Sequence, residues 1–265
     1  MRFHRVAAVG LRYVYLIRGS VSRVFPLFSW VAIDMVLWGF LTRYLNTLST
    51  VNFVPMLLGA VLLWDFFIRV MQGVTLVFFE DVWTRNFLNV FSTPLTVGEY
   101  VAGLVLSSVV SSAIGLAVML ALAVPVFGFS FAAYGALAVP YVMVLFLFGI
   151  AVGVLCCALV LRLGPAAEWF IWPIPAFISP FVGVFYPVST LPAWMRWVGR
   201  LLPPSYVFEN LRSLVLGRGP GPGGLALAGG LALLHLIVAA WVFKKVFRGA
   251  VRSGLIARYS AESVT

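Results

Sequence analysis

The stretch EDVWTRNFLNVFSTPLTVGEY, from Glu80 to Tyr100, gathers polar and charged residues between two long apolar runs. Read at 3.6 residues per turn, its apolar side chains fall on one side of a helix, namely Val82, Trp83, Phe87, Val90 and Phe91. The polar side chains recur four, four and three residues apart and share the other side: Asp81, Arg85, Asn89 and Ser92. The pattern predicts an amphipathic helix over residues 79–94 that lies on a membrane surface, ended by Pro94.

Composition identifies the whole chain as a polytopic membrane protein. Of its 265 residues, 63% are hydrophobic and only 10% are charged, whereas a soluble domain is about a quarter charged. A span needs about 20 apolar residues, which leaves room for roughly six helices and little else. The expected fold class is therefore all-α, with a single transmembrane domain over residues 1–265.

The distribution of basic residues predicts how the chain is oriented. The net charge of +10 would suit a nucleic-acid partner, but five of the 18 basic residues lie in the first 23 positions and five more follow residue 243. Basic ends that flank an apolar body follow the positive-inside rule. We therefore expect no nucleic-acid partner, both termini in the cytoplasm, an interfacial helix over residues 1–23 and a basic cytoplasmic tail over residues 244–265.

Six apolar runs are expected to span the membrane, at residues 24–45, 53–78, 101–126, 135–161, 169–186 and 225–243. The fifth contains Pro173, Pro175 and Pro180, which should kink or break it. Such interruptions are tolerated only where other helices or water meet the freed backbone groups.

The segment over residues 187–217 is too polar to span and too apolar for a solvated loop. It is expected to form two half-helices that dip back into the outer leaflet, broken at Pro203–Pro204. Four arginines on or beside this external segment run against the charge bias, and Glu209 offsets one of them. The residues expected to characterise the segment are Pro187, Pro192, Pro203, Pro204, Tyr206, Glu209 and Arg212.

Three charged residues fall inside predicted spans. Asp34 lies near the middle of the first span, and Asp65 and Arg69 share one face of the second. They could form a proton or ion relay, or a structural cluster that locks helices together or lines a wet path. His235 and the adjacent Cys156 and Cys157 are expected to be packing residues.

Motifs for catalysis are missing from the sequence. It has no serine elbow, no H-E-x-x-H and no acid cluster for metal-bound phosphate chemistry. The Gly/Pro tract at 217–224 lacks the GK[ST] ending of a phosphate-binding loop. We therefore expect no cofactor, metal or catalytic residue in this chain.

Two stretches and the order of the spans resemble a known family. The stretch EDVWTRNFLNVFSTPLTVGEYVAG at 80–103 is similar to the coupling helix, "s-P-l" turn and third span of ABC-2 type transporter permeases. The stretch FYPVSTLPAWMRWVGRLLPPSYVFENLRSLVLG at 185–217 resembles the segment between their fifth and sixth spans.

The resemblance implies a permease subunit of an ATP-driven exporter in the bacterial cytoplasmic (inner) membrane. It implies a homodimer or paired permease, surrounded by membrane lipid, with separate ABC ATPase subunits that bind ATP and Mg. The water-facing residues of the 79–94 helix, Glu80, Asp81, Arg85 and Asn86, would contact that ATPase. The path would run between the two subunits, and the cargo would be lipid-like or otherwise amphipathic.

Two other classes of protein remain open on the sequence. A proton-coupled carrier would use Asp34, Asp65 and Arg69, although the chain is short and shows no inverted repeat. A membrane anchor or assembly factor would have no use for a broken fifth span and a re-entrant segment.

Overall fold

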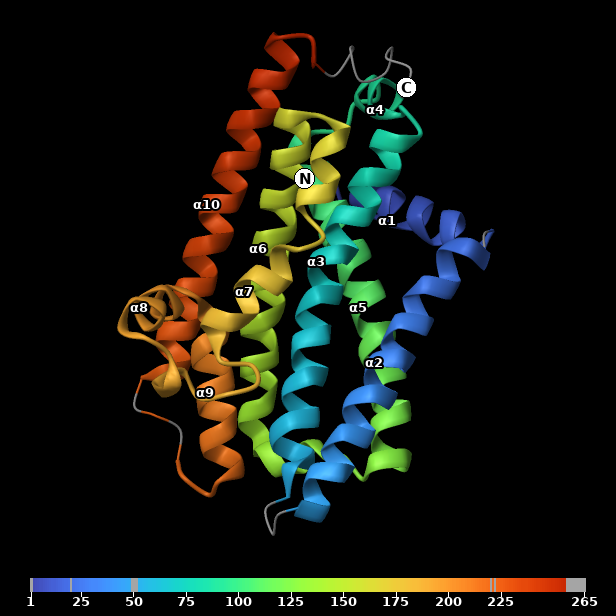
Figure 1. Cartoon of the computed structure of the whole chain (residues 1–265). Helices are drawn as coiled ribbons and strands as arrows, with labels where there is room; N and C mark the ends of the chain where they lie inside the picture. Colours follow the sequence, from blue (N-terminus) through green and yellow to red (C-terminus); the bar gives the residue numbers. More distant parts are fainter. Residues whose placement is uncertain (1, 20, 49–51, 220, 222, 256–265) are drawn as a thin grey trace.

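The computed structural model describes residues 2–19, 21–48, 52–219, 221 and 223–255, and every regular element in these ranges is helical. The last ten residues of the predicted basic tail, 256–265, lie outside the described residues. Five long helices run side by side along one axis (Figure 1): α2 (Val21–Leu48), α3 (Gly59–Trp83), α5 (Val97–Phe127), α6 (Ala138–Leu163) and α10 (Gly224–Arg252).

Four stretches in the described part of the chain are long and apolar enough to cross a membrane. They are Val54–Trp83, Val97–Phe127, Phe131–Leu163 and Gly224–Arg252. Two of them begin with a short helix of another type. The π-helix η1 (Val54–Leu58) precedes α3, and the 3-10 helix η2 (Phe131–Leu137) precedes α6. α2 has 28 residues, or about 42 Å of helix, and exposes apolar side chains such as Trp30, Ile33 and Phe40.

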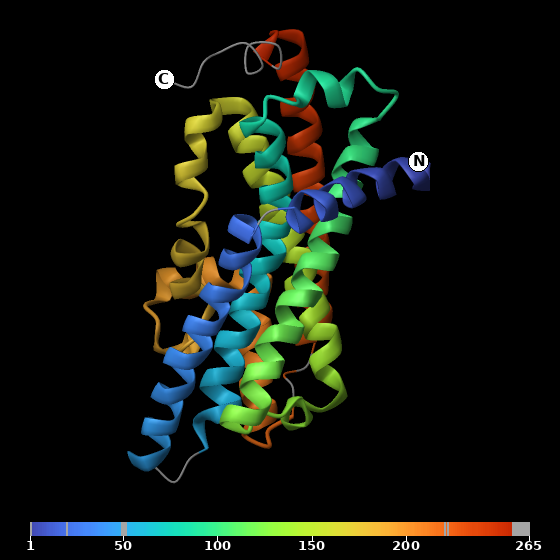
Figure 2. The ribbon, with the colours of Figure 1, turned by 90° about the vertical axis from the view of Figure 1, so that its right-hand side faces the viewer.

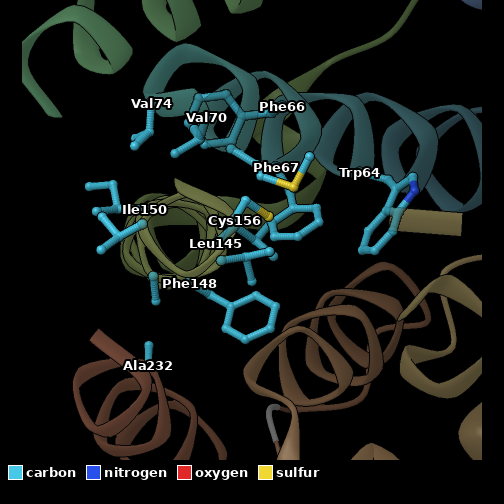
Figure 3. Packing of buried hydrophobic residues seen from close by; sticks show 14 of the residues in the cluster. Trp64, Phe66, Phe67, Val70, Val74, Leu145, Phe148, Ile150, Cys156 and Ala232 are labelled. Carbon is cyan, nitrogen blue, oxygen red and sulfur yellow. The ribbon is translucent and has the colours of Figure 1, made fainter. Parts of the chain in front are cut away.

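α6 forms the centre of the bundle, because α3 packs on one side of it and α10 on the other. Figure 3 shows apolar side chains of α3 and α6 interleaved, with Ala232 of α10 facing α6. Cys156 and Cys157 are buried in this core as free thiols, as their position in an apolar run predicts. His235 on α10 donates from Nδ1 to the Leu231 carbonyl at 2.8 Å and packs edge-on against Phe148.

The close approach of α3 and α6 depends on two glycines one turn apart. A Cβ added at Gly149 would lie 2.8 Å from the Val70 Cβ. At Gly153 it would lie 2.9 Å from both the Met71 carbonyl oxygen and the Val74 Cβ. This small-xxx-small spacing lets helix backbones approach in a membrane, where packing replaces the hydrophobic effect.

Between α6 and α10 the chain forms several short helices rather than one long helix. These are η3 (Pro165–Phe170), α7 (Ile174–Val182), η4 (Val188–Thr190), α8 (Ala193–Leu201) and α9 (Pro203–Val215). α7 has nine residues, about 14 Å of helix, which is less than half the hydrocarbon thickness of about 30 Å. The run at 169–186 is therefore not one continuous helix, and Pro173 and Pro175 lie at the start of α7 with Pro180 inside it.

α1 (Phe3–Arg18) lies across the bundle instead of along it (Figure 2). Its buried side chains, Val6, Val9 and Tyr13, share one face, while Phe3 and Leu11 are exposed. Gly103 of α5 admits this contact, because an added Cβ there would lie 2.5 Å from the Val9 Cβ. The N-terminal helix is thus amphipathic and docked on α5.

Replacing Gly153 with leucine is expected to destabilise the bundle by about 1–3 kcal/mol or more, as overpacking does. The added side chain meets the carbonyl of Met71, which α3 cannot withdraw without losing its own packing. Thermal unfolding of the detergent-purified protein measures the effect as a lower Tm. Gly230→Leu is the matched control, because a Cβ there meets nothing within 4 Å, and equal Tm shifts for both variants would contradict the packing account.

Candidate functional site at the junction of α1, α3, α4 and α5

The predicted surface helix over 79–94 is two elements in the structure, so the expectation of one continuous helix is wrong. α3 continues to Trp83, and α4 (Phe87–Phe91) is a separate helix of five residues. Arg85 separates them in a left-handed conformation, with φ 55°. The Thr84 hydroxyl donates to the Glu80 carbonyl at 2.6 Å and closes the end of α3.

Two of the predicted ATPase-contact residues do not face water. Asp81 is 1% exposed and Glu80 is 9% exposed. Both lie on the last turns of α3, where α1 and α5 pack against it. The periodicity places Asp81 opposite the aromatic residues of the stretch, but its carboxylate meets Arg12 of α1 rather than solvent. Arg85 is exposed and Asn86 is partly exposed, in the turn between the helices.

The buried carboxylate of Asp81 joins three helices. Arg12 of α1 donates from Nη2 to its Oδ2 at 2.7 Å, and the Tyr100 hydroxyl of α5 donates to the same oxygen at 2.7 Å. The side chain of Arg12 is 30% exposed, whereas that of Asp81 is 1% exposed. An ion pair so placed holds its members together strongly, because removal of one partner leaves a buried charge.

A second set of polar contacts fastens the start of α1 to the start of α5. Glu99 accepts from the Arg2 backbone N–H at 2.8 Å and from Arg5 Nη1 at 3.4 Å. It also completes a capping box with Thr96 at the N-terminus of α5. Arg5 also donates to the carbonyl of Pro94, which lies in the linker between α4 and α5, residues 92–96. α1 therefore contacts both α5 and this linker.

The surroundings of α1 set the charge states of two of its residues. Burial lowers the pKa of Arg12, but the hydrogen bond and the negative charge of Asp81 outweigh this and hold the pKa above its ordinary value. Burial, with a contribution from the charge of Glu80, raises the pKa of Tyr13 to about 12. Arg12 therefore stays cationic and Tyr13 stays neutral at physiological pH.

A groove of about 320 Å³ lies between α1 and the linker after α4, beside the Arg5–Pro94 contact. The lining residues come from both sides: Arg5, Ala8, Val9, Arg12, Val90, Thr93, Pro94 and Leu95. On the other side of α3, the Trp83 indole N–H donates to Glu168 at 2.8 Å and ties the end of α3 to η3. The end of α3 is thus connected to α1, to α5 and to the broken segment that begins at η3.

The residues predicted inside the membrane lie between α2, α3 and α5. Asp34 and Arg69 both act electrostatically on Asp65. The Arg69 side chain packs on α5, where a Cβ at Gly115 would meet its Cδ at 3.1 Å. Among the described residues Asp65 Oδ2 has no hydrogen-bond partner. The structure brings the three charges together, and their role stays a prediction.

The predicted re-entrant segment contains two short helices joined at Leu202. Pro187 and Pro192 precede η4 and α8, and Pro203 and Pro204 occupy the first turn of α9. The Tyr206 hydroxyl donates to the Arg200 carbonyl at 2.9 Å across the join.

An ion pair on α9 holds the segment to the end of α7. Glu209 accepts from Arg212 Nη1 and from the Val188 N–H, each at 2.8 Å. Arg212 also donates to the Gly183 carbonyl at 2.8 Å. Glu209 therefore offsets one of the arginines on this segment, as predicted, and the arginine is Arg212.

Sequence reasoning missed Arg12, Glu99 and Tyr100 as members of the junction. One local signal was available, since Thr96-x-x-Glu99 is a capping box that marks the start of α5. The pairing of Arg12 with Asp81 spans 69 positions, and no periodicity in a single sequence reports such a contact.

Arg12→Gln is expected to lower the Tm more than Asp81→Asn. Loss of Arg12 leaves the deeply buried Asp81 charge with the Tyr100 hydroxyl as its remaining side-chain donor within 3 Å, and unpairing a buried charge costs about 3–5 kcal/mol. Loss of the Asp81 charge leaves Arg12, which still reaches water. The double variant should recover part of the loss, as measured by thermal unfolding.

Arg85→Gln is the control for charge removal at an exposed position nearby. The account would be contradicted if Asp81→Asn lowered the Tm as much as Arg12→Gln does. It would also be contradicted if the double variant lowered the Tm by the sum of the two single shifts.

Comparison with known protein families identifies the family of the chain. The family model described as ABC-2 type transporter matches residues 17–216, which include α2 to α9 and the α3–α5 side of the junction. No curated protein matches the chain.

Proposed function

As a member of the ABC-2 type transporter family, the chain is a transmembrane permease of an ABC transporter, and we propose that it exports an amphipathic or lipid-like substrate. Members of this family pair with an ABC ATPase subunit. We propose that ATP and Mg bind to that subunit and that the permease is a homodimer in the bacterial inner membrane. The observation that carries the mechanism is the buried Asp81, which joins α1 to the end of α3 and to α5.

The proposed contact with the ATPase is the turn and short helix over residues 84–91. Arg85 and Asn89 are exposed there, and Asn86 is partly exposed. The segment lies at the end of the bundle where α10 also ends, the upper end in Figure 1. Lys244, Lys245 and Arg248 emerge from the apolar part of α10 at this end. By the positive-inside rule this end is cytoplasmic, where an ATPase would dock.

The proposed transmission of force runs from this contact to α1. Movement of the end of α3 displaces Asp81, and Arg12 follows because separation would expose an unpaired buried charge. The contact of Arg5 with the Pro94 carbonyl connects α1 to the linker after α4, and its contact with Glu99 connects α1 to the start of α5. α1 would thus move with the ATPase contact and act as a gate beside the path.

The proposed path lies between two copies of the chain. α2 exposes a row of large apolar side chains, including Trp30, Leu37 and Phe40, and α7 exposes Phe177. Asp34 is half-buried on α2, close enough to Asp65 for their charges to interact. A partner copy on this side would enclose the polar cluster, which suits the polar portion of an amphipathic cargo.

Arg85→Glu is expected to reduce the amount of ATPase subunit that copurifies with the permease by about tenfold, as loss of a charged interface contact does. Copurification and ATP turnover of the assembled complex measure the effect. Arg218→Glu is the control, because Arg218 is also exposed but lies in the connection between α9 and α10, at the opposite end of the bundle (Figure 1).

Equal losses for the two variants, or loss only for Arg218→Glu, would overturn the proposed docking end. Retention of the ATPase by both variants would remove residues 84–91 from the contact and leave the family assignment unchanged.

A further inference from the structure

An open groove lies between the C-terminal ends of α6 and α10, outside the junction described above. Its volume is about 440 Å³, larger than that of the groove beside α1. Arg162 and Leu161 line it from α6, and Trp241, Lys245 and Gly249 line it from α10. Both helices end at the α4 end of the bundle (Figure 1).

The groove combines two cations on separate helices. Arg162 and Lys245 are both exposed, and none of the described lining residues is acidic. Lys245 Nζ lies 5.1 Å from the centre of the Trp241 ring, so the ammonium group is placed over the aromatic face. The groove therefore attracts an anion.

The rest of the groove wall is apolar and lies around the end of the apolar part of α10. The apolar part of α10, residues 225–243, has a length of about 28 Å, close to the hydrocarbon thickness of a bilayer. Lys244 and Lys245 follow it, and a run of this length places them near the lipid headgroups. Trp241 is 61% exposed one turn nearer the membrane centre, and Val242, Val246 and Leu161 continue the apolar lining.

We propose that this groove binds an anionic phospholipid of the adjacent leaflet. The phosphate group contacts Arg162 and Lys245, while the first carbons of an acyl chain lie along Trp241 and Val246. A free phosphate ion would satisfy the two cations but would leave the apolar wall unused. A lipid supplies both the charge and the chain, and the site would make the α6–α10 contact depend on lipid composition.

The chain offers a way to fill the groove without removing a charge. Gly249 lines it, and a Cβ added there meets nothing within 4 Å. Gly249→Leu therefore places a side chain in the space of the lipid and leaves both helices in contact. Leucine also favours helix over glycine, so this variant is expected to fold.

Native mass spectrometry of the purified full-length permease, titrated with phosphatidylglycerol or phosphatidylcholine, tests the site. Phosphatidylglycerol should bind more tightly. Each cation near the membrane surface accounts for about a fivefold change in lipid affinity, so Arg162→Gln/Lys245→Gln should weaken binding of phosphatidylglycerol about 25-fold. Gly249→Leu should weaken it while leaving the net charge unchanged.

Lys244→Gln/Arg248→Gln is the matched control, because it removes the same charge from exposed positions of α10 that do not line the groove. Binding that is equal for both lipids, or equally weakened by the control, would show diffuse attraction to a basic surface and overturn the site. Displacement of phosphatidylglycerol by millimolar inorganic phosphate would show that the ligand is the ion rather than the lipid. These outcomes do not depend on transport and leave the proposed function untouched.

Discussion

The burial of one carboxylate, that of Asp81, constrains how the rest of the junction is built. A charge removed from water is tolerated when it is paired and hydrogen-bonded. Arg12 supplies the counter-charge and Tyr100 a further donor, each at 2.7 Å. Because these partners belong to α1 and α5, a helix that lies across the bundle is fixed to two that run along it. The same contact defines which elements must move together if the end of α3 is displaced.

The membrane-spanning architecture follows from properties that hydropathy reports directly. Apolar runs at 53–78, 101–126, 135–161 and 225–243 lie within helices long enough to cross a bilayer. Prolines marked the interrupted part of the chain, and the structure breaks at Leu202, immediately before Pro203 and Pro204. These features are local, because proline removes a backbone donor wherever it stands.

The candidate site was harder to predict, because helical periodicity identifies a polar face but not what that face meets. Asp81 and Arg85 share a side of an ideal helix, yet the first is buried against Arg12 and the second occupies a left-handed turn. A water-exposed acid and an acid paired with a distant arginine give the same pattern in sequence. Arg5 and Arg12 contribute to the basic N-terminal cluster that the positive-inside rule explains, and their acidic partners lie 94 and 69 positions away.

Spin labels at Leu11→Cys on α1 and Ser92→Cys directly after α4, both exposed positions outside the proposed ATPase contact, test most directly whether the Asp81 contact fastens α1 to the ATPase-contact segment. Labelled chains are diluted in unlabelled chains within the assembled transporter, and the distance is compared with and without ATP trapping. The distance should stay narrow and constant in the otherwise unaltered protein and should broaden when Arg12→Gln is introduced. A distance distribution that Arg12→Gln leaves unchanged in both states would show that α1 is held by other contacts, and the account of transmission would be wrong.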